Sequence, residues 1–332
     1  MQELRIGVVG CGGIARDILG LFRLTKGVRL IAFMDSDIDR ARDLARKAKS
    51  SAIYNDYEEM LSSEDLDAVY LAVPHYLHFP LAQTAIERRV HVWLEKPLAC
   101  TYENGIQLVK LAEERSIKVG VNYQYRYDPG CYALARAVQS GGLGKINYAR
   151  VNIPWHREED YFKTSRWHAS LDKAGGGTLI TQGSHLLDIA LWAIGGQPVA
   201  VMGMTAKRKY PDIEVEDLAQ ALVEMDDGVL IQICSAMVAS SDQMVTVEIY
   251  GDKVTAVYRN KPIPSVKFLD VKLKKEKVPY QGVHAIHRSL KGFRDWVLED
   301  KPYLLPAKEC LPVLAVVNAI YRSAKSGCKE QV

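Results

Sequence analysis

The first residues whose types and spacing could do chemistry are small ones near the start of the chain. A short apolar run over residues 4–9 is followed by Gly10-x-Gly12-x-x-Ala15, and an amphipathic stretch begins at Ile14. Gly10 permits a tight turn, Gly12 leaves room for a pyrophosphate beside the backbone, and Ala15 lets a helix pack closely on a strand. The phosphates would face the free N–H groups at the positive end of that helix. The pattern predicts a dinucleotide-binding turn.

An acidic residue at the expected distance supports this interpretation. A second apolar run ends in Asp35, about 20 residues beyond the last motif position. A carboxylate there accepts hydrogen bonds from the adenosine ribose hydroxyls and repels a 2′-phosphate. We therefore expect the cofactor to be NAD, with NADP disfavoured.

The elements that position these residues alternate between strand-like and helix-like segments as far as Asn122. This alternation is typical of a doubly wound parallel sheet, in which ligands bind beyond the carboxyl ends of the strands. Polar side chains follow three further predicted strands, at residues 74–78, 95–97 and 122–126. These strand ends therefore complete the predicted cofactor site.

The side chains at these strand ends leave some alternatives open. His75 and His78 fit either cofactor contacts or an exposed loop and a helix cap. Lys96 is followed by Pro97, which stiffens the backbone, and a Lys-Pro bond can be cis, which would fix the direction of the side chain. The residues expected to bind the cofactor are Gly10, Gly12, Gly13, Ile14, Asp35, Val73, Pro74, His75, His78, Glu95, Lys96 and Asn122.

From residue 125 onward, strand-like runs follow one another without helices between them, which indicates an antiparallel or mixed sheet. We expect an α/β protein in which residues 1–124 form an NAD-binding Rossmann domain with a doubly wound parallel sheet. Residues 125–332 would form a substrate-binding and oligomerisation α/β domain with a large open, mostly antiparallel sheet. An exposed face on such a sheet favours a homodimer or homotetramer.

A second group of chemistry-bearing residues follows the first predicted strand of this domain. Three glycines at 175–177 lead to Thr181 and His185, whose spacing of four places them on one face of a helix. Taken alone, the apolar neighbours of His185 favour a buried core histidine. The polar residues upstream fit either substrate contacts or ordinary surface positions; they are His156, Arg157, Arg166 and Trp167.

Composition narrows the class of protein. The 332 residues suffice for two domains, and the net charge of +3 suggests neither a nucleic-acid nor a polyanion partner. The 6 cysteines form no C-x-x-C pair, so we expect no thiolate metal site, no disulfide framework and a reduced, cytoplasmic protein. The chain opens on a strand-like run instead of a signal peptide, and no apolar run approaches the ~20 residues of a membrane span.

On these motifs the chain resembles the glucose–fructose oxidoreductase / inositol dehydrogenase family of NAD(P)-dependent sugar and cyclitol dehydrogenases. The matching pieces are residues 10–15, Asp35, Glu95-Lys96-Pro97, the glycines at 175–177, His185 and Asp188. The resemblance implies a Rossmann domain followed by an α/β domain with a large open sheet. It also implies that Lys96 and His185 are the catalytic pair, which reverses the interpretation of His185 as a core residue.

The resemblance leaves the substrate subgroup open. Thr181 stands where many members carry an aspartate, so a relay ending in a carboxylate is not expected. Members acting on nucleotide-linked N-acetyl sugars look closer, with residues similar to Gln182 and Tyr161. Inositol dehydrogenases instead use a pair similar to His156-Arg157.

The activity implied is reversible oxidation of a secondary hydroxyl on a sugar-like ring, such as C3 of a UDP-N-acetyl sugar. Lys96 would act as general base, which requires a pKa below the usual ~10.4 of lysine. His185 would pass the proton on, and Thr181 would orient it. The expected substrate contacts are Lys96, Arg126, His156, Arg157, Arg166, Trp167, Thr181 and His185. The alternatives are an inositol or free-sugar dehydrogenase and a non-catalytic NAD-binding sensor or regulator.

Overall fold

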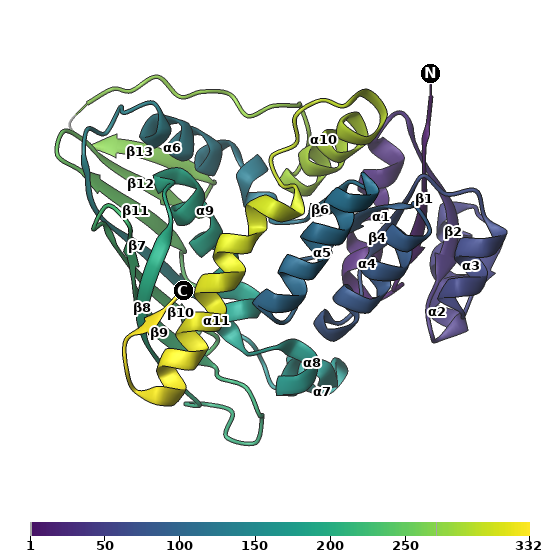
Figure 1. Ribbon diagram of the computed structural model, residues 1–332, viewed down its shortest axis with the longest axis horizontal. Helices are drawn as coiled ribbons and strands as arrows, with labels where there is room; N and C mark the ends of the chain where they lie inside the picture. The colour runs from purple at the N-terminus through teal and green to yellow at the C-terminus, as the bar shows by residue number, and fades with distance from the viewer. Residues whose placement is uncertain (1, 270) are drawn as a thin grey trace. The chain divides into compact units, whose positions relative to one another are not determined.

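The computed structural model describes residues 2–269 and 271–332, which divide into two compact units (Figure 1). Unit 1 contains the chain up to Ala99, then Glu103–Tyr123 and Pro279–Glu309. Unit 2 contains Cys100–Tyr102, Gln124–Val278 and Cys310–Val332. The expected assignment of all of residues 125–332 to a second domain is therefore wrong for the segment 279–309.

The returning segment belongs to unit 1 because its helix buries an aromatic face there. The helix α10 (Ala285–Glu299) places Phe293 against Trp93, with ring centroids 6.2 Å apart. A side chain at Gly120 would lie within 3.0 Å of Phe293 and 2.8 Å of Tyr303, so the strand passes directly under these rings. Sequence order alone gave no sign of this return.

Unit 1 is built on a parallel sheet of six strands in the order β3-β2-β1-β4-β5-β6. Its strands are β1 (Leu4–Val9), β2 (Val28–Met34), β3 (Ala52–Tyr54), β4 (Ala68–Leu71), β5 (His91–Leu94) and β6 (Val119–Val121). Its helices, besides α10, are α1 (Gly13–Leu24), α2 (Ile38–Ala48), α3 (Tyr57–Ser63), α4 (His78–Glu87) and α5 (Tyr102–Arg115). The strand order reverses direction between β1 and β4, which is where ligands bind in doubly wound folds.

Unit 2 is built on an eight-stranded sheet in the order β13-β12-β11-β7-β10-β9-β8-β14. Only β7 and β10 pair in parallel, and the other neighbours are antiparallel. The strands are β7 (Ile146–Pro154), β8 (Pro198–Ala206), β9 (Leu218–Met225), β10 (Leu230–Ala236), β11 (Thr246–Gly251), β12 (Thr255–Arg259), β13 (Ser265–Leu269) and β14 (Glu330–Gln331). The mostly antiparallel sheet expected from the sequence is confirmed.

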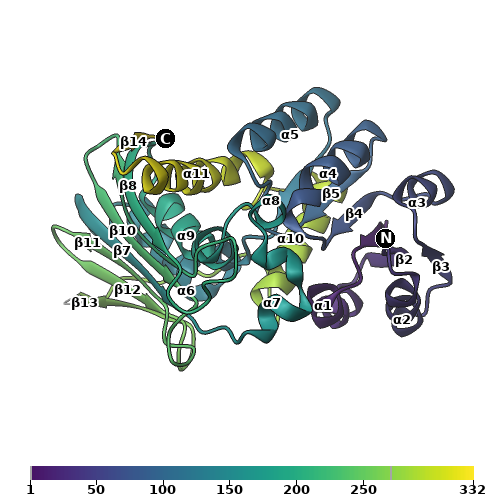
Figure 2. The ribbon, with the colours of Figure 1, turned by 90° about the horizontal axis from the view of Figure 1, so that it is seen from below.

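Three long helices cover one face of this sheet, as Figure 2 shows. They are α6 (Pro129–Gln139), α9 (Ser184–Ile194) and α11 (Leu311–Ser326), with the short helices α7 (Asp160–Thr164) and α8 (Leu171–Ala174) outside them. α9 packs on β7 and β11, α11 on β8, and α6 on β12 and β13. The opposite face carries exposed apolar side chains such as Met202, Met204 and Leu222.

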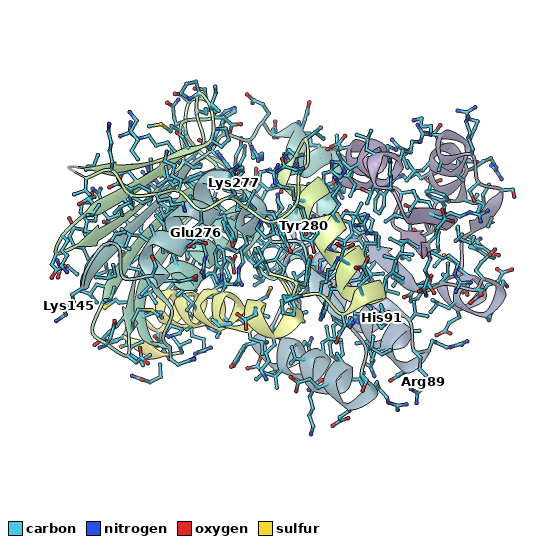
Figure 3. The ribbon with its side chains drawn as sticks, turned by 90° about the horizontal axis from the view of Figure 1, so that it is seen from above. Arg89, His91, Lys145, Glu276, Lys277 and Tyr280 are labelled. Carbon is cyan, nitrogen blue, oxygen red and sulfur yellow. The ribbon has the colours of Figure 1, made fainter. Side chains whose placement is uncertain are left out.

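The charged segment 272–277 connects unit 2 to the part of the chain that belongs to unit 1 again. This segment is largely exposed. Figure 3 shows Glu276 and Lys277 on this connection. Glu276 accepts a hydrogen bond of 3.1 Å from the Arg136 guanidinium. No helix among the described residues is long and apolar enough to cross a membrane.

Candidate active site

The dinucleotide motif lies at the turn from β1 into α1 in unit 1. Gly10 has φ +86, and a Cβ there would come within 2.4 Å of the Ala72 carbonyl oxygen, so only glycine fits. The space beside Gly12 and Gly13 is open to 4 Å. No described side chain caps the first N–H groups of α1, and Ile14 beside them is 38% exposed. This turn therefore has the open N–H groups and the room that a pyrophosphate needs.

Asp35 follows β2 and is held by backbone donors. Its Oδ2 accepts from the Cys11 N–H at 2.7 Å and its Oδ1 from the Asp37 N–H at 3.0 Å. These bonds fix a carboxylate beside the glycine turn, and the remaining lone pairs of its oxygens can accept from ribose hydroxyls. Burial, followed by the charge of Asp35, raises the pKa of the Cys11 thiol to about 12, so that thiol stays neutral.

A buried hydrogen-bond network lies behind Lys96 at the end of β5. Glu95 accepts 2.8 Å hydrogen bonds from the Tyr70 hydroxyl and from the Asn122 amide, both at Oε1. Burial raises the pKa of Glu95, and these two donors act in the opposite direction. The Lys96–Pro97 peptide bond is cis, as hypothesised from the sequence. Three strands, β4, β5 and β6, thus hold the backbone from which Lys96 extends.

Two residues expected to contact the cofactor have other partners. The ring of His78 is fully buried, and its nitrogens lie 2.6 Å from the Pro97 carbonyl and 3.0 Å from the Val73 carbonyl. Burial lowers the pKa of His78 to about 4, so it is neutral near pH 7. His78 is therefore not an exposed loop histidine; it is the first residue of α4, and its contact with the cofactor stays a prediction. Asn122 is also fully buried, and its side-chain amide donates a hydrogen bond to Glu95.

In unit 2, two of the three glycines, Gly176 and Gly177, pack against a tyrosine and a buried glutamate. Glu216 accepts from the Gly177 N–H at 2.7 Å, the Leu179 N–H at 2.9 Å and the Tyr321 hydroxyl at 2.9 Å. A Cβ at Gly177 would lie 1.8 Å from the Glu216 carbonyl oxygen, and one at Gly176 2.1 Å from the Tyr321 hydroxyl. The glycines are therefore required by this close packing. Burial raises the pKa of Glu216.

The segment that leads to His185 is a π-helical turn, Leu179–Gly183, where a continuous α-helix was expected from Thr181. Helix α9 begins only at Ser184. The Thr181 hydroxyl donates to the Gly177 carbonyl at 2.7 Å, so its proton is directed to the backbone. Single π turns are frequent at functional sites, because they displace side chains from the regular helical positions.

Helix α9 is tied to the segment that follows β6 by a buried ion pair. Arg126 donates to both carboxylate oxygens of Asp188, at 2.9 and 2.6 Å, and both side chains are almost fully buried. The ring of the neighbouring Tyr125 lies 5.5 Å from that of His185, edge to face. The guanidinium predicted to contact substrate is thus engaged by Asp188 and positions the helix that carries His185.

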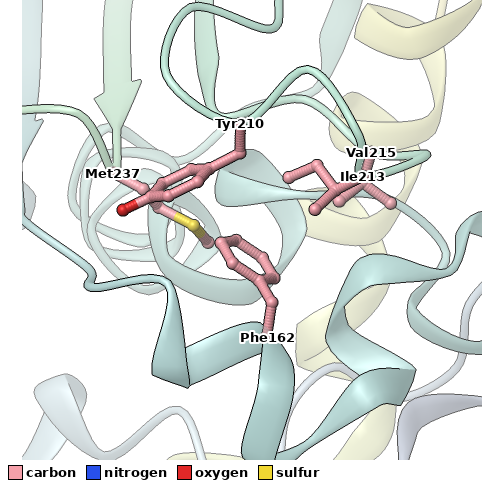
Figure 4. Close-up of a cluster of buried hydrophobic side chains, with 5 residues drawn as sticks. All are labelled: Phe162, Tyr210, Ile213, Val215 and Met237. Carbon is pink, nitrogen blue, oxygen red and sulfur yellow. The ribbon is translucent and has the colours of Figure 1, made fainter.

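The upstream candidates gather around an apolar cluster of Phe162, Tyr210, Ile213, Val215 and Met237 (Figure 4). Tyr161 packs against this cluster, and the Arg157 guanidinium lies 5.6 Å from the Tyr161 ring. Burial raises the pKa of Tyr161 to about 12, against the effects of Arg157 and of its polar neighbours Thr181 and Gln182. The structure therefore places Arg157 and Tyr161 beside the π turn.

The remaining upstream candidates lie farther toward the surface. The His156 ring nitrogens lie 2.6 Å from the Ala239 carbonyl and 2.6 Å from Glu158, which raises the pKa of His156. The Trp167 ring stacks on His168 at 3.7 Å. Arg166 borders a hollow of about 450 Å³ that Lys163 and Lys209 also line. The substrate contacts predicted for His156, Arg166 and Trp167 stay predictions.

Sequence reasoning did not identify Glu216, Tyr70 or Tyr321. Each is remote in the chain from the residue that it supports, and no local motif marks it. The triple glycine was the available signal, because three glycines in a row indicate that something packs directly against the backbone.

Comparison with known proteins agrees with this geometry. Residues 4–123 match the model of an oxidoreductase family with an NAD-binding Rossmann fold, and residues 132–257 match the GFO/IDH/MocA C-terminal domain. The matches define an NAD-dependent oxidoreductase that acts on CH–OH groups. The chain belongs to the GFO/IDH/MocA family, as the resemblance noted in the sequence implies.

Individual relatives have low sequence identity to this chain, but the matches cover most of its length. An inositol 2-dehydrogenase of Saccharopolyspora erythraea is 30% identical over 70% of this chain and 66% of its own length. A 1,5-anhydro-D-fructose reductase of Ensifer adhaerens is 26% identical over 79% of each chain. The crystal structure of the WlbA dehydrogenase from Bordetella pertussis, in complex with NADH and UDP-GlcNAcA, superposes with a TM-score of 0.88 at 25% identity, covering 100% of this chain and 99% of that one.

Proposed function

We propose that the chain oxidises a secondary hydroxyl of a nucleotide-linked sugar, with Lys96 and His185 as its acid–base groups. The observation that carries the proposal is the support given to each residue. Lys96 extends from a backbone held by the Glu95 network, and His185 follows a turn held by Glu216. The similarity to a dehydrogenase crystallised with UDP-GlcNAcA supports the choice of a nucleotide-linked substrate.

Bound NAD supplies the hydride acceptor. The neutral amine of Lys96 accepts the proton of the substrate hydroxyl as the carbon loses its hydride. His185 binds the same or the adjacent hydroxyl and passes the proton on to water. In the reverse direction Lys96 donates the proton to the forming alcohol. Thr181, whose hydroxyl donates to Gly177, lies in the turn that precedes His185 and would orient it.

The test compares turnover with cofactor binding. NADH formation is followed at 340 nm with UDP-GlcNAcA, myo-inositol and glucose, in the wild type and in Lys96→Ala. We expect turnover with UDP-GlcNAcA and a loss of roughly 10³-fold in Lys96→Ala, typical of removing a general base. The NAD dissociation constant should stay within about threefold. A preference for myo-inositol would favour the cyclitol alternative, and NAD binding without any turnover would favour a sensor.

We also propose that the exposed face of the unit 2 sheet pairs with a second copy of the chain. The strand register places Met202 opposite Leu222, and Leu230 opposite Tyr148, on this face. Met204 beside them is 77% exposed. The double change Met204→Glu and Leu222→Glu should shift the sedimentation coefficient to that of a monomer. An unchanged coefficient would exclude this face as the interface.

A further inference from the structure

Gln182 is a buried carboxamide that has the Tyr161 hydroxyl as a polar neighbour but no partner in good hydrogen-bond geometry among the described residues. Only 3% of the residue is exposed, and among the described residues neither its Nε2 nor its Oε1 has a hydrogen-bond partner. Buried polar side chains are nearly always paired, and a stranded donor and acceptor together are unfavourable enough to require an explanation. A bound group with both hydrogen-bonding capacities would supply one.

The backbone around Gln182 is fixed, so the side chain cannot easily turn away. It lies inside the π turn, whose start is held by the Glu216 carboxylate through the Leu179 N–H. The Ile180 N–H also donates to the Tyr321 hydroxyl at 3.3 Å. On the other side, a Cβ at Gly183 would lie 2.9 Å from the Ser235 side chain, so the turn packs tightly on β10.

The surroundings of the carboxamide contain two neutral hydroxyl groups and, beyond one of them, the Arg157 guanidinium. The Tyr161 hydroxyl lies near Thr181 and Gln182, and its raised pKa of about 12 keeps it protonated. The Thr181 hydroxyl donates to the Gly177 carbonyl. Arg157 contacts the face of the Tyr161 ring. The carboxamide itself offers a donor, Nε2, and an acceptor, Oε1, which together suit a neutral substituent that both accepts and donates.

We propose that Gln182 is a specificity-determining residue that hydrogen-bonds a neutral hydroxyl or acetamido substituent on the ring carbon next to the one that is oxidised. Gln182 lies in the π turn, and His185 is the second residue of the helix that follows it, so the same short segment carries both side chains. This inference rests on the proposed function and adds the group by which the substrate is selected.

The experiment is a double-mutant cycle between the residue and the substituent. Wild type and Gln182→Met are compared on UDP-GlcNAcA, on UDP-glucuronic acid, which carries a hydroxyl at C2, and on its 2-deoxy analogue. Binding of each in the presence of NADH is measured by calorimetry beside kcat/KM. For the wild type, we expect kcat/KM to be about 30-fold lower on the 2-deoxy analogue than on UDP-glucuronic acid. For Gln182→Met, we expect kcat/KM on the 2-deoxy analogue to lie within about threefold of the values on the other two compounds.

The controls separate this role from folding and from the proposed function. Gln107→Leu makes a comparable change at an exposed position of α5 and should leave the discrimination intact. Gln182→Glu, which keeps an acceptor and loses the donor, provides a second variant if the methionine does not fold. Equal losses on all three compounds, or unchanged discrimination, would overturn the role of Gln182. A wild type that neither binds nor turns over any of them would overturn the proposed function itself.

Discussion

Each unit contains a glutamate that accepts a hydrogen bond from a tyrosine, and in each pair one partner is buried, Tyr70 in unit 1 and Glu216 in unit 2, while the other is partly exposed. In unit 1, the Tyr70 hydroxyl donates to Glu95 at 2.8 Å, and in unit 2 the Tyr321 hydroxyl donates to Glu216 at 2.9 Å. Burial raises the pKa of both carboxyl groups, and the tyrosine acts against it in both. The two pairs nevertheless support different parts of the structure, the end of β5 in unit 1 and the π turn in unit 2.

The two glutamates differ in which carboxylate oxygens accept hydrogen bonds and in which groups donate them. Tyr70 and Asn122 both donate to Oε1 of Glu95, and the backbone N–H of Lys96 also acts on this carboxylate. Glu216 uses its two oxygens separately, Oε2 for the Gly177 N–H and Oε1 for the Leu179 N–H. The first glutamate therefore gathers two side-chain donors on one oxygen at a strand end, whereas the second holds two backbone N–H groups, one on each oxygen, before His185.

The largest expected effect comes from replacing each carboxylate with an amide. Glu95→Gln can keep its single oxygen where Oε1 was, and we expect it to lower the free energy of unfolding by only about 1 kcal/mol. Glu216→Gln must turn an NH₂ group toward the Gly177 or the Leu179 N–H. We expect a loss of roughly 4 kcal/mol, because charged hydrogen bonds are lost and a buried donor is stranded. Urea unfolding of the two variants measures both. Similar losses would show that the two glutamates are equivalent supports.

The contrast also explains how much the sequence could predict. The glycine motif, Asp35 and the Lys96 strand end were predicted because each lies within a few residues of the element that positions it. The parallel and antiparallel sheets were predicted from the order of apolar runs. Glu216 was missed because its partners come together only through the fold, and the π turn was missed because its periodicity differs little from that of an α-helix over so few residues.

The next largest expected effect is the pH dependence of the unfolding free energy that His78 of unit 1 causes. His78 supports the Pro97 backbone in unit 1 and has a pKa of about 4, below the usual 6.5. The unfolded chain therefore takes up this proton first, and stability is lost as the pH falls from about 6.5 to about 4, by roughly 3 kcal/mol in total. The raised pKa values of Glu95 and Glu216 act in the opposite sense. We expect His78→Asn to flatten the fall in unfolding free energy over this window.

A matched histidine provides the control for this prediction. His156 is a surface residue whose pKa is raised by Glu158, so its contribution is present at low pH and disappears as the pH rises. His156→Asn should therefore leave the acid-side fall in place. An equally steep fall in His78→Asn and the wild type would assign the acid sensitivity to other groups.

Asp35 is a third carboxylate that accepts hydrogen bonds from backbone N–H groups, and it tests whether a carboxylate held in this way can still bind a ligand. Asp35, like Glu216, uses its two oxygens separately for backbone N–H groups, yet it lies beside the open glycine turn. We expect Asp35→Ala to weaken NAD binding by about 10–100-fold, because two ribose hydrogen bonds are lost, and to weaken NADP binding much less. Fluorescence titration with NADH and NADPH measures both constants. An unchanged ratio of the two would show that Asp35 serves only to hold the turn.

The smallest expected effects come from the two tyrosines. Tyr70→Phe and Tyr321→Phe each remove one hydroxyl donor from a buried carboxylate, and each should cost about 1–2 kcal/mol of unfolding free energy. Tyr321→Phe should be the more damaging of the two, because the Tyr321 hydroxyl also accepts from the Ile180 N–H within the π turn. It should in addition lower kcat/KM with little change in NAD affinity, since it loosens the backbone beside Gln182. If Tyr70→Phe instead produced the larger loss of turnover, the support behind Lys96 would limit catalysis more than the turn before His185.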